Sequence, residues 1–147
     1  MGGMNQLERR IAGRIIIEGV AQGEALAATE PLSFWGGYSQ TTGEIIDRRH
    51  PLSGQIGAGR ILVLPFTRGS STTTAILLES VRKGVAPAAL ITDRADVFLA
   101  LASVVADEMY ESSFPMIAVS RDDFESIATG DQVRIEEDGT IVVTPEA

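Results

Sequence analysis

The sequence predicts an α/β domain with a mixed sheet, flanking helices and a hairpin at each end. Three apolar runs, 60–65, 88–91 and 115–119, have the length and composition of short buried strands. The first two are each followed by a segment of helical periodicity, and strand–helix alternation is typical of a parallel sheet. Turn signals near both ends of the chain add antiparallel pairs, so we expect the sheet to be mixed.

The N-terminal part predicts two strands. Residues 1–9 are expected to be a flexible lead-in to one domain over 10–147. Residues 13–19 form a β-branched run closed by glycine, and residues 23–29 follow after a short break. Two such runs with a short connection predict a hairpin or a strand pair.

A long loop is predicted over residues 33–55. It holds few periodic apolar residues and several turn signals, namely Gly36-Gly37, Thr42-Gly43, His50-Pro51 and Ser53-Gly54. A loop of this length inside a compact domain is often functional. We interpret His50 as a loop-fixing residue, whereas Arg48 or Arg49 could hold a substrate carboxylate.

Helices are predicted after each of the central apolar runs. The first spans about 72–83 and ends at Gly84, and the second spans about 95–109. After the third run, Ser120 is expected to cap a short helix, with Asp123 three residues further on in the manner of a capping box.

The C-terminal part predicts a hairpin. Residues 132–135 and 140–143 flank Asp138-Gly139, a strong signal for a tight turn. The acidic residues at this turn, Glu136, Glu137 and Asp138, are given no chemical role.

Composition excludes several classes of function. The 147 residues include no cysteine, so this chain cannot form disulfides or hold zinc or an iron–sulfur cluster by thiolates. A net charge of −8 argues against binding to nucleic acid or to anionic membranes. No stretch reaches the ~18 apolar residues of a membrane span, and no signal peptide is evident, so we expect a cytoplasmic protein.

The segment 66–73 is the foremost candidate for a functional site. It joins a buried strand to a helix start, where unpaired backbone N–H groups favour an anion, and Gly69 allows a ligand to approach the backbone. The alternative is that Ser70 or Ser71 is simply the N-cap. Conventional serine nucleophile chemistry lacks the second glycine of its elbow motif, and a nucleotide-binding loop lacks its lysine.

A family resemblance rests on several separate motifs at defined spacings. They are Gly36-Gly37, Gly43-x-Ile45-x-Asp47-x-x-His50-Pro51-x-x-Gly54, the apolar strand 60–65, Gly69-Ser70 and Pro87-Ala88. From about Ile11 to Val143 the chain resembles the small subunit, or swivel-domain half, of the aconitase X family. The resemblance implies a swivelling β/β/α domain and a hydro-lyase acting on a small molecule. It also implies a large-subunit partner that holds an iron or iron–sulfur centre.

By the same resemblance, Ser70 is the catalytic base. The substrate-binding candidates are Arg68, Gly69, Ser71, Thr72, Gly36 and Gly37. A helix start stabilises a serine alkoxide by only about 2 kcal/mol in a partly buried site. That is too little alone, so the isolated subunit is expected to be inactive. An exposed apolar or glycine-rich face should therefore exist around 36–55 and 68–71, where the large subunit would dock.

The predicted substrate depends on one difference between this sequence and the archaeal members of the family. Archaeal members resemble mevalonate 5-phosphate dehydratases and continue after Gly-Ser into a Thr-Val-Gly-Ser-like stretch, whereas this chain has Ser71-Thr72-Thr73-Thr74. Bacterial members resemble cis-3-hydroxy-L-proline dehydratases, which we favour. A non-catalytic module whose loop only binds an anion is the alternative from another class of protein.

Overall fold

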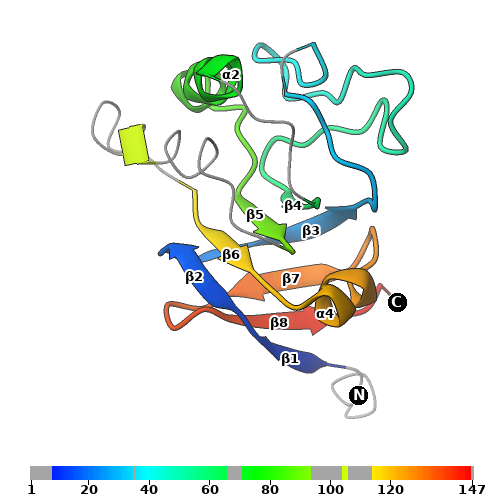
Figure 1. Cartoon of the computed structure of the whole chain (residues 1–147), viewed down its shortest axis with the longest axis vertical. Coiled ribbons are helices and arrows are strands. Elements are labelled where there is room, and N and C mark those ends of the chain that lie inside the picture. Colours follow the sequence, from blue (N-terminus) through cyan, green and yellow to red (C-terminus); the bar gives the residue numbers. More distant parts are fainter. Residues whose placement is uncertain (1–7, 35, 66–70, 94–103, 106–113, 147) are drawn as a thin grey trace.

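The computed structural model describes residues 8–34, 36–65, 71–93, 104–105 and 114–146, and of residues 71–74 only the backbone. Within this part of the chain, eight strands and the helices α2 and α4 are defined (Figure 1). The strands are β1 (Arg9–Ala12), β2 (Arg14–Ile17), β3 (Ala21–Ala27), β4 (Ile61–Val63), β5 (Ala89–Thr92), β6 (Met116–Ala118), β7 (Gln132–Ile135) and β8 (Thr140–Thr144), and the helices are α2 (Ser71–Arg82) and α4 (Arg121–Ser126).

The strands form one mixed sheet that nearly closes into a barrel. Their order is β1-β8-β7-β3-β4-β5-β6-β2. The neighbours from β3 to β6 are parallel, while β1, β8, β7 and β3 pair in antiparallel fashion and β2 is antiparallel to β6. Because β1 and β2 are consecutive in the chain but lie at opposite ends of this order, one chain segment joins both ends of the sheet.

Two segments pass between the antiparallel and the parallel halves. In β3, residues 21–24 pair with β7 and residues 25–27 pair with β4. Between β1 and β2 the passage is made at Gly13, whose N–H donates to the Gly139 carbonyl at 3.2 Å. A Cβ on Gly13 would lie 2.2 Å from Ile117 Cγ2, so only glycine fits there. Strands that switch sheets in this way form the corners of orthogonally packed sheets.

The predicted fold class is confirmed, with one correction at the N-terminus. The two N-terminal segments do not form a hairpin with each other: β2 pairs with β6, and β3 pairs with β4 and β7. Both segments are apolar enough for strands, but apolar content does not specify a partner. The connection 18–20 does not form a tight turn that would pair β3 with β2. It leads the chain to a place in the sheet between β7 and β4.

The other predicted elements agree with the structure where it describes them. Helix α2 is followed by Gly84 in a left-handed conformation with φ of +74°, and β7 and β8 form the C-terminal hairpin. Ser120 caps α4, since its side chain accepts a hydrogen bond from the Asp123 N–H at 3.2 Å. The helix expected over 95–109 lies outside the described residues except for 104–105, which are helical.

Alternate side chains of the parallel strands enter two different cores. In β4, Ile61 and Val63 belong to a cluster with the antiparallel strands, while Leu62 belongs to a second cluster together with Leu77 of α2. Successive side chains on a strand point to opposite faces, so both faces of the parallel half are covered. The second cluster lies under α2 and the long loop and consists of Leu26, Leu32, Phe34, Tyr38, Ile45, Leu52, Leu62, Leu64, Leu77, Leu90, Phe114 and Met116.

Candidate active site at the carboxyl edge of the parallel strands

The parallel strands β3 to β6 end at one edge of the sheet. Hydrogen bonds continue past their ends: the Leu64 N–H donates to the Ile91 carbonyl at 3.0 Å, and the Val119 N–H donates to the Thr92 carbonyl at 2.9 Å. Ligands of parallel α/β sheets bind outside the carboxyl ends of the strands. The segment that follows β4 leaves from this edge and leads to α2, so the edge is the candidate active site.

The predicted catalytic residue Ser70 lies outside the described residues, as do Arg68 and Gly69. These assignments stay predictions. Ser71, the next residue, is the first of α2, a helix of 12 residues. Its first turn contains no acidic residue, so no carboxylate there opposes an anion at the amino end of the helix. Ser71 and Thr72 contribute backbone to this turn, and their contact with substrate stays a prediction.

The predicted long loop is a packed lobe, defined here as residues 36–57. Two antiparallel bridges order it, Tyr38 with Ile45 and Glu44 with Ile56. Tyr38 is buried, its ring lies 5.4 Å from that of Phe34, and its hydroxyl donates to the Val85 carbonyl at 2.6 Å. Burial raises the pKa of Tyr38 above its ordinary range. The lobe is thereby fixed to the turn that follows α2.

His50 fixes the other side of the lobe. Its side chain is buried, and its Nδ1 accepts a hydrogen bond from the Leu52 N–H at 3.1 Å. The proton of the neutral ring is therefore on Nε2, which donates to the Glu30 carbonyl at 3.0 Å. Both ring nitrogens are engaged by backbone, which supports the interpretation of His50 as a loop-fixing residue.

The predicted contact residues Gly36 and Gly37 differ in what the backbone requires. Gly36 is exposed with φ of +78°, and no described atom lies within 4 Å of where a Cβ would be. Gly37 is buried, and a Cβ would lie 2.1 Å from the Ser33 carbonyl oxygen. Gly36 thus leaves open space at the surface, while Gly37 permits a close backbone contact. A contact of either with substrate stays a prediction.

Sequence reasoning missed an ion pair at the same edge. Asp93 directly follows β5, and its Oδ2 accepts a hydrogen bond from Arg121 Nη1 at 2.7 Å. Asp93, together with Glu125 at 3.1 Å, raises the pKa of Arg121. The pair links the end of β5 to the start of α4. Its only signal in the sequence is that Asp93 and Arg121 each follow shortly after an apolar strand.

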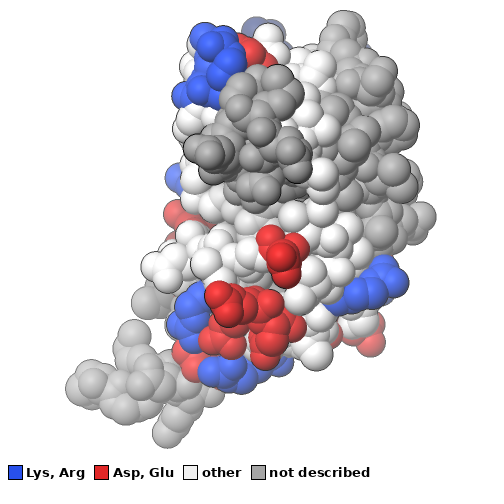
Figure 2. Space-filling view, turned by 90° about the vertical axis from the view of Figure 1, so that its left-hand side faces the viewer, with Lys and Arg blue, Asp and Glu red and all other residues white. Residues whose placement is uncertain are grey.

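No metal site was found in the described part of the chain: no three His, Asp or Glu side chains there are placed to hold a metal ion. Among the same residues, no helix is long and apolar enough to cross a membrane. Figure 2 shows acidic and basic side chains next to each other on the side where the β7–β8 turn projects. Glu136, which directly follows β7, takes part in two ion pairs, one with Arg10 and one with Arg134.

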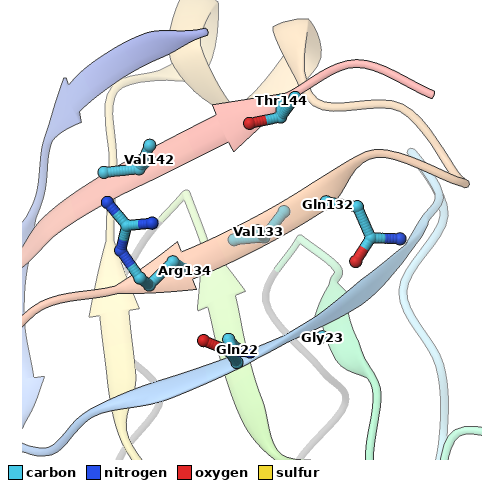
Figure 3. A pocket seen from close by; sticks show the side chains of 7 residues that line it. All are labelled: Gln22, Gly23, Gln132, Val133, Arg134, Val142 and Thr144. Carbon is cyan, nitrogen blue, oxygen red and sulfur yellow. The ribbon is translucent and has the colours of Figure 1, made fainter. Parts of the chain in front are cut away.

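A pocket of about 210 Å³ lies on the antiparallel half. Figure 3 shows it between β3, β7 and β8, with polar side chains pointing from all three strands. Its lining consists of Gln22, Gly23, Gln132, Val133, Arg134, Val142 and Thr144.

Comparison with known proteins connects this arrangement to one family. The family profile described as "Aconitase X swivel domain" matches residues 10–144. The chain is 44% identical over 80% of its length to a cis-3-hydroxy-L-proline dehydratase of Pseudomonas aeruginosa, but it spans only 20% of that protein. It is 34% identical over 86% of its length to the phosphomevalonate dehydratase small subunit of Methanopyrus kandleri, of which it spans 90%. Aconitase X of Thermococcus kodakaraensis superposes with a TM-score of 0.82 at 31% identity, covering 93% of this chain and 99% of that one.

Proposed function

Because this chain belongs to the aconitase X swivel-domain family, we propose that it is the swivel subunit of a dehydratase whose active site is completed by a large chain. The observation that carries the proposal is the family match over residues 10–144, combined with a helix that begins directly after Ser70. Two kinds of relative support the need for a large chain. The hydroxyproline dehydratases are about five times as long as the matched region, and the relatives of similar length are named small subunits.

The proposed substrate is cis-3-hydroxy-L-proline. Identity to the dehydratases of that name is 44% for Pseudomonas aeruginosa and 37% for Hypocrea jecorina. Identity to the phosphomevalonate dehydratase small subunits ranges from 28% to 37%. The stretch Ser71-Thr72-Thr73-Thr74, which departs from the archaeal loop pattern, supports the same choice.

Phosphomevalonate is the second candidate substrate, and a specific observation favours it. The chain spans 90% of the Methanopyrus kandleri small subunit and 93% of the Archaeoglobus fulgidus small subunit, so it matches those proteins along almost their entire length.

The proposed reaction begins with proton removal by Ser70. In cis-3-hydroxy-L-proline the hydrogen beside the carboxylate is on the carbon next to the one that carries the hydroxyl. The Ser70 alkoxide takes this proton, the C–H electron pair forms the double bond, and the C–O bond breaks so that the hydroxyl leaves as hydroxide with the electron pair of that bond. The amino end of α2 stabilises the alkoxide by about 2 kcal/mol. The rest of the stabilisation of the alkoxide must come from Arg68, the substrate or groups on the large chain.

The residues that the structure describes do not fit a metal centre. Cysteine is absent from the sequence, and the described His, Asp and Glu side chains form no group of three that could hold a metal ion. The proposal therefore assigns the iron or iron–sulfur centre to the large chain.

An assay of the assembled complex tests the function. The chain is co-expressed with the large chain from the same genome, and consumption of cis-3-hydroxy-L-proline and of mevalonate 5-phosphate is measured separately. We expect turnover of the first. Turnover of the second alone would leave the dehydratase class intact and replace the substrate. No turnover of either, with tight anion binding by the isolated chain in isothermal titration, would favour the non-catalytic module.

A further inference from the structure

The helices that follow β4 and β6 pack on opposite faces of the sheet (Figure 1). Leu77 of α2 shares a buried cluster with Leu62 of β4. Phe124 of α4 belongs to the other cluster, together with Val63. Outside the carboxyl ends of parallel strands, a crevice that binds ligands forms where the connections leave to opposite faces. In this sheet that position is the end of β5, which lies between β4 and β6.

The segment 121–129, which contains α4, follows the carboxyl edge past the end of β4. At its start, Arg121 donates to Asp93, which directly follows β5. Near its end, Thr129 Oγ1 accepts a hydrogen bond at 2.9 Å from the N–H of Ala27, the last residue of β3. Because β4 lies between β3 and β5, the segment passes the end of the strand that leads to α2. Arg121 and the amino end of α2 therefore border the same crevice.

The guanidinium of Arg121 is held by three neighbours and is still exposed. Nη1 donates to Asp93 Oδ2 at 2.7 Å, and the side chain of Asp93 is only 6% exposed, so a buried carboxylate fixes the group. Nε donates to Glu125 at 3.1 Å, and the guanidinium carbon lies 5.3 Å from the centre of the Phe124 ring. The side chain of Arg121 is 52% exposed, and its hydrogen bonds to the described residues use only Nη1 and Nε. Both donors of Nη2 are thus open to a ligand.

Glu125 is a weak competitor for this guanidinium. Its side chain is 51% exposed, and an ion pair between two exposed side chains contributes little because water screens it. A ligand carboxylate in a site that a second chain closes is shielded from water, which strengthens its attraction to the guanidinium. The crevice therefore offers a fixed positive charge to an enclosed carboxylate.

We propose that Arg121 binds the carboxylate of the substrate, an inference that rests on the proposed function. Both candidate substrates carry a carboxylate, and the proton that the base removes is on the carbon beside it. As this proton leaves, negative charge spreads toward the carboxylate, so a fixed cation there stabilises the transition state as well as the bound substrate. Arg121 thereby adds a positive charge on the side of the crevice opposite the amino end of α2.

Substitution of Arg121 in the assembled complex tests the assignment with the substrate that the wild-type complex turns over. Arg121→Ala should lower kcat/KM about 10- to 100-fold, the usual effect of losing a hydrogen bond to a charged group. Arg82→Ala is the matched control, because Arg82 is similarly exposed, at 53%, and pairs with Glu79 in the last turns of α2. It should change kcat/KM less than about threefold.

A neutral analogue identifies the group that Arg121 contacts. The carboxamide of the same substrate, added as a competitive inhibitor, has no carboxylate, so its Ki should differ less than about threefold between wild type and Arg121→Ala. Because Arg121→Ala removes the ion-pair partner of Asp93, the double variant Asp93→Asn/Arg121→Gln, which removes both charges, is measured as well and should show the same loss. Circular dichroism melts and titration with the large chain establish that each variant is folded and assembled.

The outcomes separate this inference from the proposed function. If the folded and assembled variants keep the wild-type kcat/KM, Arg121 does not bind the carboxylate and the proposed function stands. Equal weakening of the substrate and of its carboxamide would also overturn the inference, since Arg121 would then shape the site without contacting the carboxylate. If the wild-type complex turns over neither candidate substrate, the proposed function is overturned and this inference with it.

Discussion

Ser70 is the single residue on which the proposed chemistry depends most. In the complex with the large chain, Ser70→Ala should lower kcat by 10²- to 10⁴-fold, roughly the usual contribution of a positioned general base. Thr144→Ala, in β8 on the antiparallel half, is the control and should change kcat less than about threefold. The measurement is steady-state turnover, accompanied by titration to show that the large chain still binds. Full turnover by the folded Ser70→Ala complex would remove Ser70 from the mechanism.

Tyr38 supports a prediction about stability and its dependence on pH. Tyr38→Phe removes the donor to the Val85 carbonyl, which should lower the free energy of unfolding by about 1–2 kcal/mol. The folded protein holds the pKa of Tyr38 above its ordinary value of 10.0, so the unfolded chain ionises first. The contribution of Tyr38 to stability is thus fully present below pH 10.0 and is lost as the pH rises beyond it.

Denaturant unfolding at pH 8 and at pH 11 checks both parts. The difference in stability between wild type and Tyr38→Phe should shrink at the higher pH. A difference that is equal at both values would show that the hydroxyl is not buried as described.

At the residue scale, the sequence predicted the role of His50 correctly, because a single histidine in a polar loop has few structural roles. A lone histidine before Pro51 in a polar loop was interpreted as loop-fixing, and its two backbone partners support that reading. The pair of Asp93 and Arg121 was missed because its members are 28 residues apart, and neither residue alone predicts an ion pair. The role of Ser70 came from a resemblance, since a helix start and a glycine explain an anion site but not a base.

At the scale of elements, Gly13 controls the joint between β1 and β2. Gly13→Ala would place a methyl group 2.2 Å from Ile117 Cγ2 and 2.7 Å from the Gly139 carbonyl oxygen. Relief of this overlap must move the backbone away from its hydrogen bond to Gly139, so we expect a loss of about 2–4 kcal/mol. Denaturant unfolding of the purified chain is the measurement.

Gly59→Ala is the matched control for this substitution. Gly59 has φ of +71° but no described atom within 4 Å of the would-be Cβ, so only backbone strain of about 1–2 kcal/mol should result. Equal losses in the two variants would mean that the joint is not tightly packed.

The parallel strands were predictable because their side chains are buried on both faces of the sheet. β4 and β5 are buried on both faces, which requires the continuous apolar runs that the sequence displays. The C-terminal hairpin was predictable because Asp138-Gly139 encodes its own turn. The partners of β2 and β3 were not, since these strands pair with segments far away in the sequence, and local patterns carry no information about such neighbours.

At the scale of the whole molecule, activity should require two chains. Neither this chain nor the large chain alone should dehydrate cis-3-hydroxy-L-proline, because a helix start stabilises the Ser70 alkoxide by only about 2 kcal/mol. Titrating this chain into a fixed amount of the large chain should raise the rate to a plateau. Turnover by the isolated chain would contradict the proposal that its site is incomplete.

The joining of both sheet ends by β1 and β2 also constrains how the protein is made. Both strands are synthesised well before their partners, β8 and β6. Contacts between residues so distant in sequence are slow to form because a large loop must close first. The isoleucine-rich strand β2 therefore stays without its partner until β6 has been synthesised, and β1 stays without its partner until β8 has been synthesised, so the sheet can be completed only after residue 144.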